Sequence, residues 1–219
     1  MNMPLLLRPL CAAAAWTLCA LPAIAQSQAP ASDAADAPMP LVYDATAREA
    51  PAVLHKGTCP IRVAPTSDER QNKLAIGANL RGPLLTGDAS PWITDGLMQL
   101  KDFGYPVARD SSAAPPPEGI LVKTAVTRAY TWQVGLKLFG MIALKAQFVG
   151  KDGVLQDKYY RAHGDKTNMW GASSEYLTTL NYGVNNLLRV MADDLVRLCA
   201  GAKVEPYSYA GPEAAPPAK

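Results

Sequence analysis

Residues 136–149 read LKLFGMIALKAQFV, and this segment is the clearest β-strand in the sequence. Its apolar side chains alternate with others, so they share one face of a pleated strand. That face carries Leu136, Leu138, Ile142, Leu144, Ala146 and Phe148. The opposite face carries Lys137, Lys145 and Gln147. The GKDG sequence at 150–153 is typical of a tight hairpin turn and predicts an antiparallel neighbour.

Further strands are expected on both sides of this segment. Residues 120–132 are rich in Val, Thr, Tyr and Trp, and residues 154–163 return after the hairpin turn. Residues 58–66 predict a short strand near the start of the folded region. Residues 67–89 are polar and Gly-rich, and predict a long loop with one short strand near 74–76.

Two helices are expected. The first begins with Ser90 as its N-cap and ends at Gly104, a residue suited to a left-handed cap. The second spans 173–199, where apolar residues recur at spacings of three and four, the strongest periodic signal in the chain. Ser173 or Ser174 is expected to cap it.

These elements predict a single α+β domain over residues 56–203. The expected order is β-α-β-β-β-α, an antiparallel-dominated sheet with two helices on one face. Residues 26–55 are rich in Ala, Pro, Ser and Asp, and predict a flexible leader. Residues 204–219 contain several prolines among small residues, and predict a disordered tail.

Residues 1–25 have the features of a secretory signal peptide. The apolar run at 10–21 is too short to span a bilayer, and small residues precede an expected cleavage site after Ala25. Cys11 and Cys19 each follow a leucine, which is too bulky for a lipoprotein signal. We therefore expect a released periplasmic protein with no transmembrane segment in the mature chain.

Charge and motifs exclude several classes of function. The formal net charge is +2, so we expect no nucleic-acid partner. The sequence contains no GxGxxG, P-loop, HExxH or GxSxG motif. We therefore predict no catalytic residues, no metal site and no cofactor, and we expect that the protein is not an enzyme.

The cysteines predict a disulfide bond. Cys11 and Cys19 leave with the signal peptide, while Cys59 and Cys199 remain in the mature chain. Two cysteines in an exported protein usually pair. Because the closed loop is long, the bond is expected to stabilise the fold by about 4–5 kcal/mol.

Six residues are candidates for an interaction surface. The run 138–144, which includes Phe139 and Met141, is apolar on both faces. Such a strand is either central and buried on both sides, or part of a sheet whose second face meets a partner or a lipid. Trp132 and Trp170, together with Trp92, form either a ligand platform or core or interface packing, which is the commoner role of tryptophan.

The remaining two candidates are Asp68 and Arg70 in the long loop at 67–89. The Asp68-Glu69-Arg70 segment either binds a partner or an ion, or forms a turn with a local Asp–Arg pair. The local pair is the preferred interpretation.

The chain resembles small envelope lipoproteins, including the auxiliary lipoproteins that accompany MCE-type lipid transporters. The resemblance covers residues 58–200 and rests on the order of elements together with short sequence features. These features are Asp68-Glu69-Arg70, Ile76-Gly77, Phe103-Gly104-Tyr105 with Val107, the turn at 150–153 and Tyr160-Arg161. The resemblance implies a non-enzymatic protein, and some members of these families assemble into rings or complexes in the periplasm. This chain departs from them because it lacks their lipidated cysteine.

The expected function is therefore that of a non-enzymatic periplasmic accessory protein. It would act by protein–protein interaction with an envelope protein, or by self-association. The alternative is a periplasmic carrier of a small ligand or lipid, which would use the surface of residues 136–148 and the tryptophans.

Overall fold

The computed structural model describes residues 38–48, 54–55, 59–79, 81–112, 114–168 and 172–211. These residues belong to one compact unit. The predicted signal peptide, its cleavage site and Trp170 lie outside the described residues.

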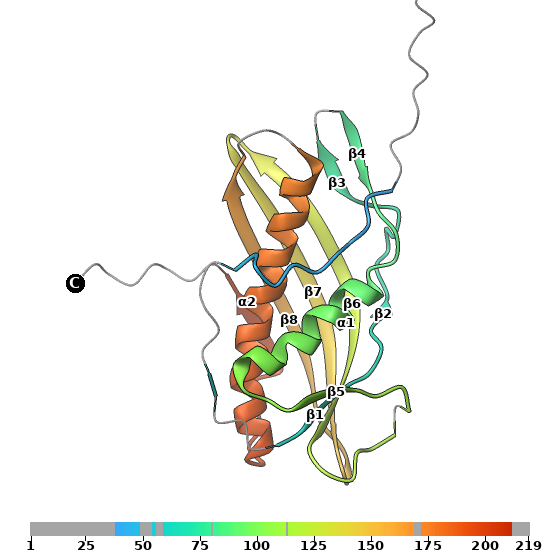
Figure 1. Cartoon of the computed structure of the whole chain (residues 1–219), viewed down its shortest axis with the longest axis vertical. Helices are drawn as coiled ribbons and strands as arrows, with labels where there is room; N and C mark the ends of the chain where they lie inside the picture. The colour runs from blue at the N-terminus through green and yellow to red at the C-terminus, as the bar shows by residue number, and fades with distance from the viewer. Residues whose placement is uncertain are drawn as a thin grey trace, which may run out of the picture. The chain divides into compact units, whose positions relative to one another are not determined.

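Three long strands form the centre of the sheet as an antiparallel meander (Figure 1). They are β6 (Ile120–Val134), β7 (Lys137–Gly150) and β8 (Gly153–Thr167). β7 pairs with both neighbours along its whole length, and Gly150 lies opposite Gly153 at the predicted hairpin turn. The sequence-based strands are thus confirmed, and β6 and β8 extend beyond the predicted ends.

Short strands extend this meander at both edges, and they run parallel to their neighbours. These strands are β1 (Ile61–Val63), β2 (Ser67–Asp68), β5 (Val107–Arg109) and β9 (Tyr207–Ala210). The order of the sheet is β5-β1-β6-β7-β8-β9, and β2 pairs with β6 beyond β1. The α+β class is confirmed, whereas the parallel edge strands β2, β5 and β9 were not predicted.

The predicted loop at 67–89 contains a second, two-stranded sheet. β3 (Ala75–Asn79) and β4 (Gly82–Leu85) pair as an antiparallel hairpin that stands beside β6 (Figure 1). The prediction of a single short strand near 74–76 is therefore wrong. The second strand has only four residues, including a proline, so its sequence carries little strand signal.

The first helical segment has two parts. α1 (Ser90–Leu97) continues into a 3-10 helix, η1 (Met98–Phe103), which ends at Gly104. Gly104 has φ of 95°, so the predicted left-handed cap is confirmed. Ala89, not Ser90, occupies the N-cap position, because Ser90 is instead bound through its N–H and hydroxyl to the carboxylate of Asp88.

The long helix α2 has the predicted bounds, Ser173–Cys199. Ala172 is its N-cap and makes no side-chain capping bond, so the prediction of a serine cap is wrong. Gly140 of β7 and Gly164 of β8 lie beneath the helix. A Cβ atom on Gly140 would lie 2.5 Å from the backbone nitrogen of Leu180, and one on Gly164 would lie 2.2 Å from the Cβ of Tyr182. These two glycines allow the helix to approach the sheet closely.

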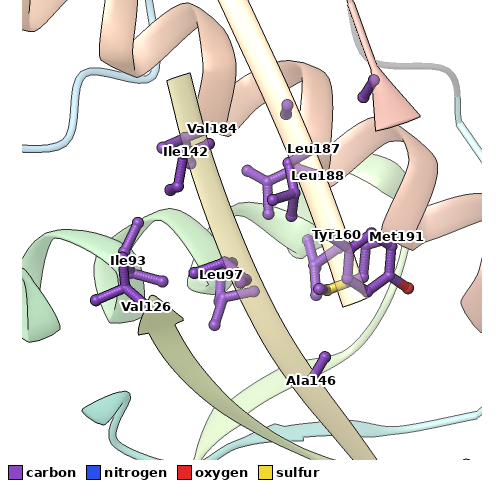
Figure 2. Packing of buried hydrophobic residues seen from close by; sticks show 14 of the residues in the cluster. Ile93, Leu97, Val126, Ile142, Ala146, Tyr160, Val184, Leu187, Leu188 and Met191 are labelled. Atoms are coloured by element: carbon purple, nitrogen blue, oxygen red, sulfur yellow. The ribbon is translucent and has the colours of Figure 1, made fainter. Parts of the chain in front are cut away.

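Both helices lie on one side of the sheet, as predicted (Figure 1). The strand side chains that point towards them are largely apolar, and α2 contributes an apolar stripe (Figure 2). The core includes Ile93, Leu97, Val126, Ile142, Ala146, Tyr160, Val184, Leu187, Leu188 and Met191. We call this covered side the inner face of the sheet. Leu136, which the alternation assigns to this face, is 74% exposed because it lies in the turn before β7.

Two terminal segments differ from the sequence-based expectation. Residues 204–211, assigned to a disordered tail, include β9, which pairs with β8. Residues 38–48, assigned to a flexible leader, lie against α2. Asn181 and Asn185 of α2 donate side-chain hydrogen bonds to backbone carbonyls of this segment, at 3.1 Å to Val42 and 2.6 Å to Ala47.

Candidate functional site

The face of the sheet opposite the helices is the candidate functional surface. No helix in the described part of the chain packs on this side (Figure 1), which we call the outer face. Strand alternation and register place these side chains on it: Lys123, Ala125, Arg128, Tyr130, Trp132, Phe139, Met141, Ala143, Lys145, Gln147, Asp157, Tyr159, Arg161, His163, Asp165, Tyr207 and Tyr209. Rings and charged groups predominate there, whereas aliphatic side chains predominate on the inner face.

An aromatic cluster of Tyr130, Trp132 and Phe139 lies on the outer face towards the β6–β7 turn. Trp132 is directly opposite Phe139, and their rings stack with centroids 5.2 Å apart. The Tyr130 ring stacks on Trp132 at 5.3 Å. All three residues are half-buried.

Met141 completes this region. It lies opposite Tyr130, and its sulfur accepts a hydrogen bond of 3.0 Å from Nε of Arg161. Met141 itself is buried among its neighbours. The structure therefore brings together three of the predicted surface residues, namely Trp132, Phe139 and Met141.

Asp68 and Arg70 do not belong to this surface. Their side chains are only 6% and 2% exposed, respectively, and they form an ion pair of 2.8 Å. Arg70 also donates to the carbonyl of Gly87 at 2.8 Å, and Asp68 accepts from the backbone N–H of Ala89 at 3.1 Å. The pair thus joins the end of β2 to the start of α1. The ion pair agrees with the local-pair interpretation, and an interaction role for these two residues stays a prediction.

The pKa of Asp68 reflects this environment. Burial acts to raise the pKa, but hydrogen bonds from the Arg70 side chain and from the N–H groups of Ala89 and Arg70 outweigh it. They hold the pKa at about 2, below its ordinary value of 3.8. Asp68 is therefore ionised at neutral pH.

A second group of rings was missed by the sequence analysis. Tyr207 of β9 stacks on Tyr159 at 6.3 Å, and Tyr209 stacks on His163 at 5.4 Å. The two tyrosines of β9 are 49% and 53% exposed. The signal was the alternation in YSYA at 207–210, which favours a strand with both tyrosines on one face.

A buried polar cluster under α2 also has the residue types of an acid–base site. Lys158 lies 2.6 Å from Asp194, and the Tyr160 hydroxyl donates to the same carboxylate at 2.7 Å. Burial, and then the charge of Asp194, raise the pKa of Tyr160. The side chains of Lys158 and Asp194 are 1% and 10% exposed, so the cluster is largely buried. Its groups satisfy one another and fasten β8 to α2.

The predicted cysteine pair is joined. Cys59 and Cys199 form a disulfide with their Cα atoms 5.9 Å apart. It connects the segment before β1 to the last residue of α2. Within the described ranges, no group of three or more His, Cys, Asp or Glu side chains is arranged to hold a metal ion.

Comparisons with known proteins give structural neighbours only. No protein-family model matches the sequence, and no curated protein matches it. A DUF330 protein from Xanthomonas campestris is similar at 12% identity and a TM-score of 0.44, over 70% of this chain and 89% of that one.

Two further solved structures are similar to the chain. Lipoprotein GNA1162 from Neisseria meningitidis is 14% identical with a TM-score of 0.33, over 65% of this chain and 99% of that one. A PelC dodecamer from Paraburkholderia phytofirmans is 15% identical with a TM-score of 0.35, over 64% and 92%. Lipoproteins are thus among the neighbours, and the resemblance to MCE-associated proteins stays a prediction. Among the residues that the structure describes, no helix is long and apolar enough to cross a membrane.

Proposed function

We propose that this chain is a non-enzymatic accessory protein of the periplasm that binds an envelope protein, or a second copy of itself, through its outer face. The observation that carries the proposal is the aromatic cluster of Tyr130, Trp132 and Phe139 on a sheet face that no described helix covers. Aromatic side chains and Met are enriched where protein surfaces bind one another.

The geometry of the cluster favours a protein partner. Its rings stack on one another across two strands, with interplanar angles of 29° and 12°. They therefore cover part of one another's faces and form one apolar patch across β6 and β7. Half-buried aromatic patches of this kind suit the central anchors of a protein interface.

Photo-crosslinking in intact cells tests the proposal. A photoreactive amino acid replaces Trp132 in one variant and Val196, an exposed apolar residue of α2, in a control variant. We expect a specific product only from position 132, and its mass distinguishes a second copy from another envelope protein. In addition, Trp132→Ala/Phe139→Ala should abolish the association while the fold is retained, and Val196→Ala should not.

The proposal is contradicted if both positions give the same products, or if neither gives any and the protein sediments as a monomer. Its periplasmic part is tested separately by cell fractionation and N-terminal sequencing. An N-terminus other than residue 26, or recovery in the cytoplasm, would contradict export with cleavage after Ala25.

A further inference from the structure

Two adjoining cavities hollow the outer face beside β2 and the loop that follows it. One has a volume of about 530 Å³ and the other about 580 Å³. Glu69, Lys145 and Tyr159 line both of them. Because they share these walls, we treat them as one trough. Each of the two volumes is of the size that small ligands occupy.

A β-bulge shapes the trough. The register of β6 against β7 shifts between Val126 and Arg128, so Thr127 is an extra residue. The Thr127 hydroxyl donates to the carbonyl of Ala143 at 3.1 Å and lies 3.2 Å from the hydroxyl of Tyr159. Bulges of this kind redirect side chains and occur next to functional sites. Here the bulge places Arg128 in the wall of the second cavity.

The walls of the trough carry more positive than negative charge, because Lys123, Arg128 and Lys145 outnumber the carboxylates of Glu69 and Asp157. Within the described residues, neither Arg128 nor Lys123 takes part in an ion pair. Lys145 pairs with Glu69 at 3.3 Å, and both side chains of this pair are largely exposed. Exposed pairs of this kind contribute little stability, so they exchange partners readily.

We infer that this trough binds an oxyanion, the phosphate or carboxylate group of a small anionic ligand. The planar guanidinium of Arg128 matches either group with two parallel hydrogen bonds. Lys145 supplies a second positive charge once the ligand replaces Glu69 as its partner. The rings of Tyr130 and Tyr159 line the same space and suit an apolar part of the ligand.

Titration of the chain recovered from cells tests this site with two probes. The first is inorganic phosphate, and the second is phosphatidylcholine vesicles containing phosphatidylglycerol, with pure phosphatidylcholine vesicles as a blank. Arg128→Gln should weaken binding about tenfold, because it removes a charged hydrogen-bond donor. Glu69→Gln should strengthen binding, because it frees Lys145 and removes a like charge.

The matched control is Lys151→Gln, which removes the same charge from the turn between β7 and β8, outside the trough. It should bind both probes as the unchanged protein does, and thermal unfolding should show that all variants fold. Binding of free phosphate identifies a soluble ligand, and binding of the charged vesicles alone identifies a lipid headgroup. Both results support the site if Arg128→Gln weakens them.

The inference is overturned if neither probe binds, or if Lys151→Gln weakens binding as much as Arg128→Gln does. It does not rest on the proposed protein partner, although Tyr130 belongs to both the aromatic cluster and the trough. Trp132→Ala/Phe139→Ala should lose the partner and still bind the oxyanion, whereas Arg128→Gln should show the reverse. The two ideas can therefore fail separately.

Discussion

The two faces of the sheet are built from the same three long strands but differ in side-chain type and in burial. The inner face meets α2 mainly with aliphatic side chains and with Gly140 and Gly164, so the contact is close. The outer face carries stacked rings, charged side chains and cavities instead. Fully buried apolar side chains are thus concentrated on the inner face, whereas the aromatic cluster of the outer face is only half-buried.

The disulfide should give the largest effect, because it fastens the end of α2 to the segment that precedes β1. Replacing Cys59 and Cys199 by alanine should lower the free energy of unfolding by about 5 kcal/mol, since the bond closes a long loop in the unfolded chain. Urea unfolding of the variant, compared with the oxidised protein, measures this loss. Free thiols in protein isolated from the periplasm would contradict the pairing itself.

Breaking the buried ion pair between Lys158 of β8 and Asp194 of α2 should have the second largest effect on stability. Lys158→Met leaves Asp194 charged and without its ion-pair partner, which should cost about 4 kcal/mol of stability. Chemical denaturation measures the loss. Lys158→Met/Asp194→Leu is the control, because removing both charges should restore much of the stability. If the single variant is as stable as the unchanged protein, the pair does not hold β8 to the helix.

Truncating an aliphatic side chain of α2 that packs in the core should have the third largest effect on stability. Leu188 of α2 is fully buried, so Leu188→Ala should cost about 3 kcal/mol through lost contacts and the remaining cavity. Val196→Ala, on the exposed side of the same helix, should cost less than about 0.5 kcal/mol. Equal effects of the two substitutions would show that α2 does not pack as described.

Low pH should lower the free energy of unfolding by a smaller amount, because it protonates Asp68 between β2 and α1. The pKa of Asp68 is about 2 in the folded protein and 3.8 without its partners. A lowered pKa contributes stability above the unfolded value, and this contribution is lost as the pH falls from about 4 to 2. The expected loss is about 2 kcal/mol, and Asp68→Asn should remove this part of the pH dependence. An unchanged acid profile in Asp68→Asn would contradict it.

The smallest effect on stability is expected on the outer face. Trp132→Ala should lower the free energy of unfolding by about 1 kcal/mol, because the ring is only half-buried and no helix covers it. The same substitution should nevertheless weaken partner binding strongly. Thermal unfolding and photo-crosslinking of one preparation measure the two quantities together. A loss of stability as large as that of Leu188→Ala would remove the distinction between the faces.

The elements that could be predicted from the sequence are the long ones. β7 and α2 repeat their apolar residues over 14 and 27 residues, respectively, long enough for periods of two and of three to four to be distinct. Phe139 and Met141 could be proposed as surface residues because the run 138–144 is apolar on both faces, and Trp132 because it could belong to a ligand platform. The trough was not predicted, because Glu69, Arg128 and Lys145 meet only through strand pairing.

The short edge strands escaped prediction for a related reason. β5 and β9 have three and four residues, too few for a period to show, and they form because a neighbouring strand offers unpaired backbone groups. The segment 38–48 has no pattern of its own and is held by Asn181 and Asn185 of α2. Its partners lie more than a hundred residues away in the sequence.

The sequence by itself determined the α+β class, the three-stranded meander, the two helices and the cysteine pair, because alternation, periodicity and cysteine number are local or compositional properties. Only the tertiary structure decided which loops and short edge strands pack against this frame. That packing buries the pair of Asp68 and Arg70 and leaves Trp132 and Phe139 half-buried on the outer face. The physical reason is that burial depends on which elements pack together, and a single residue's type does not specify this.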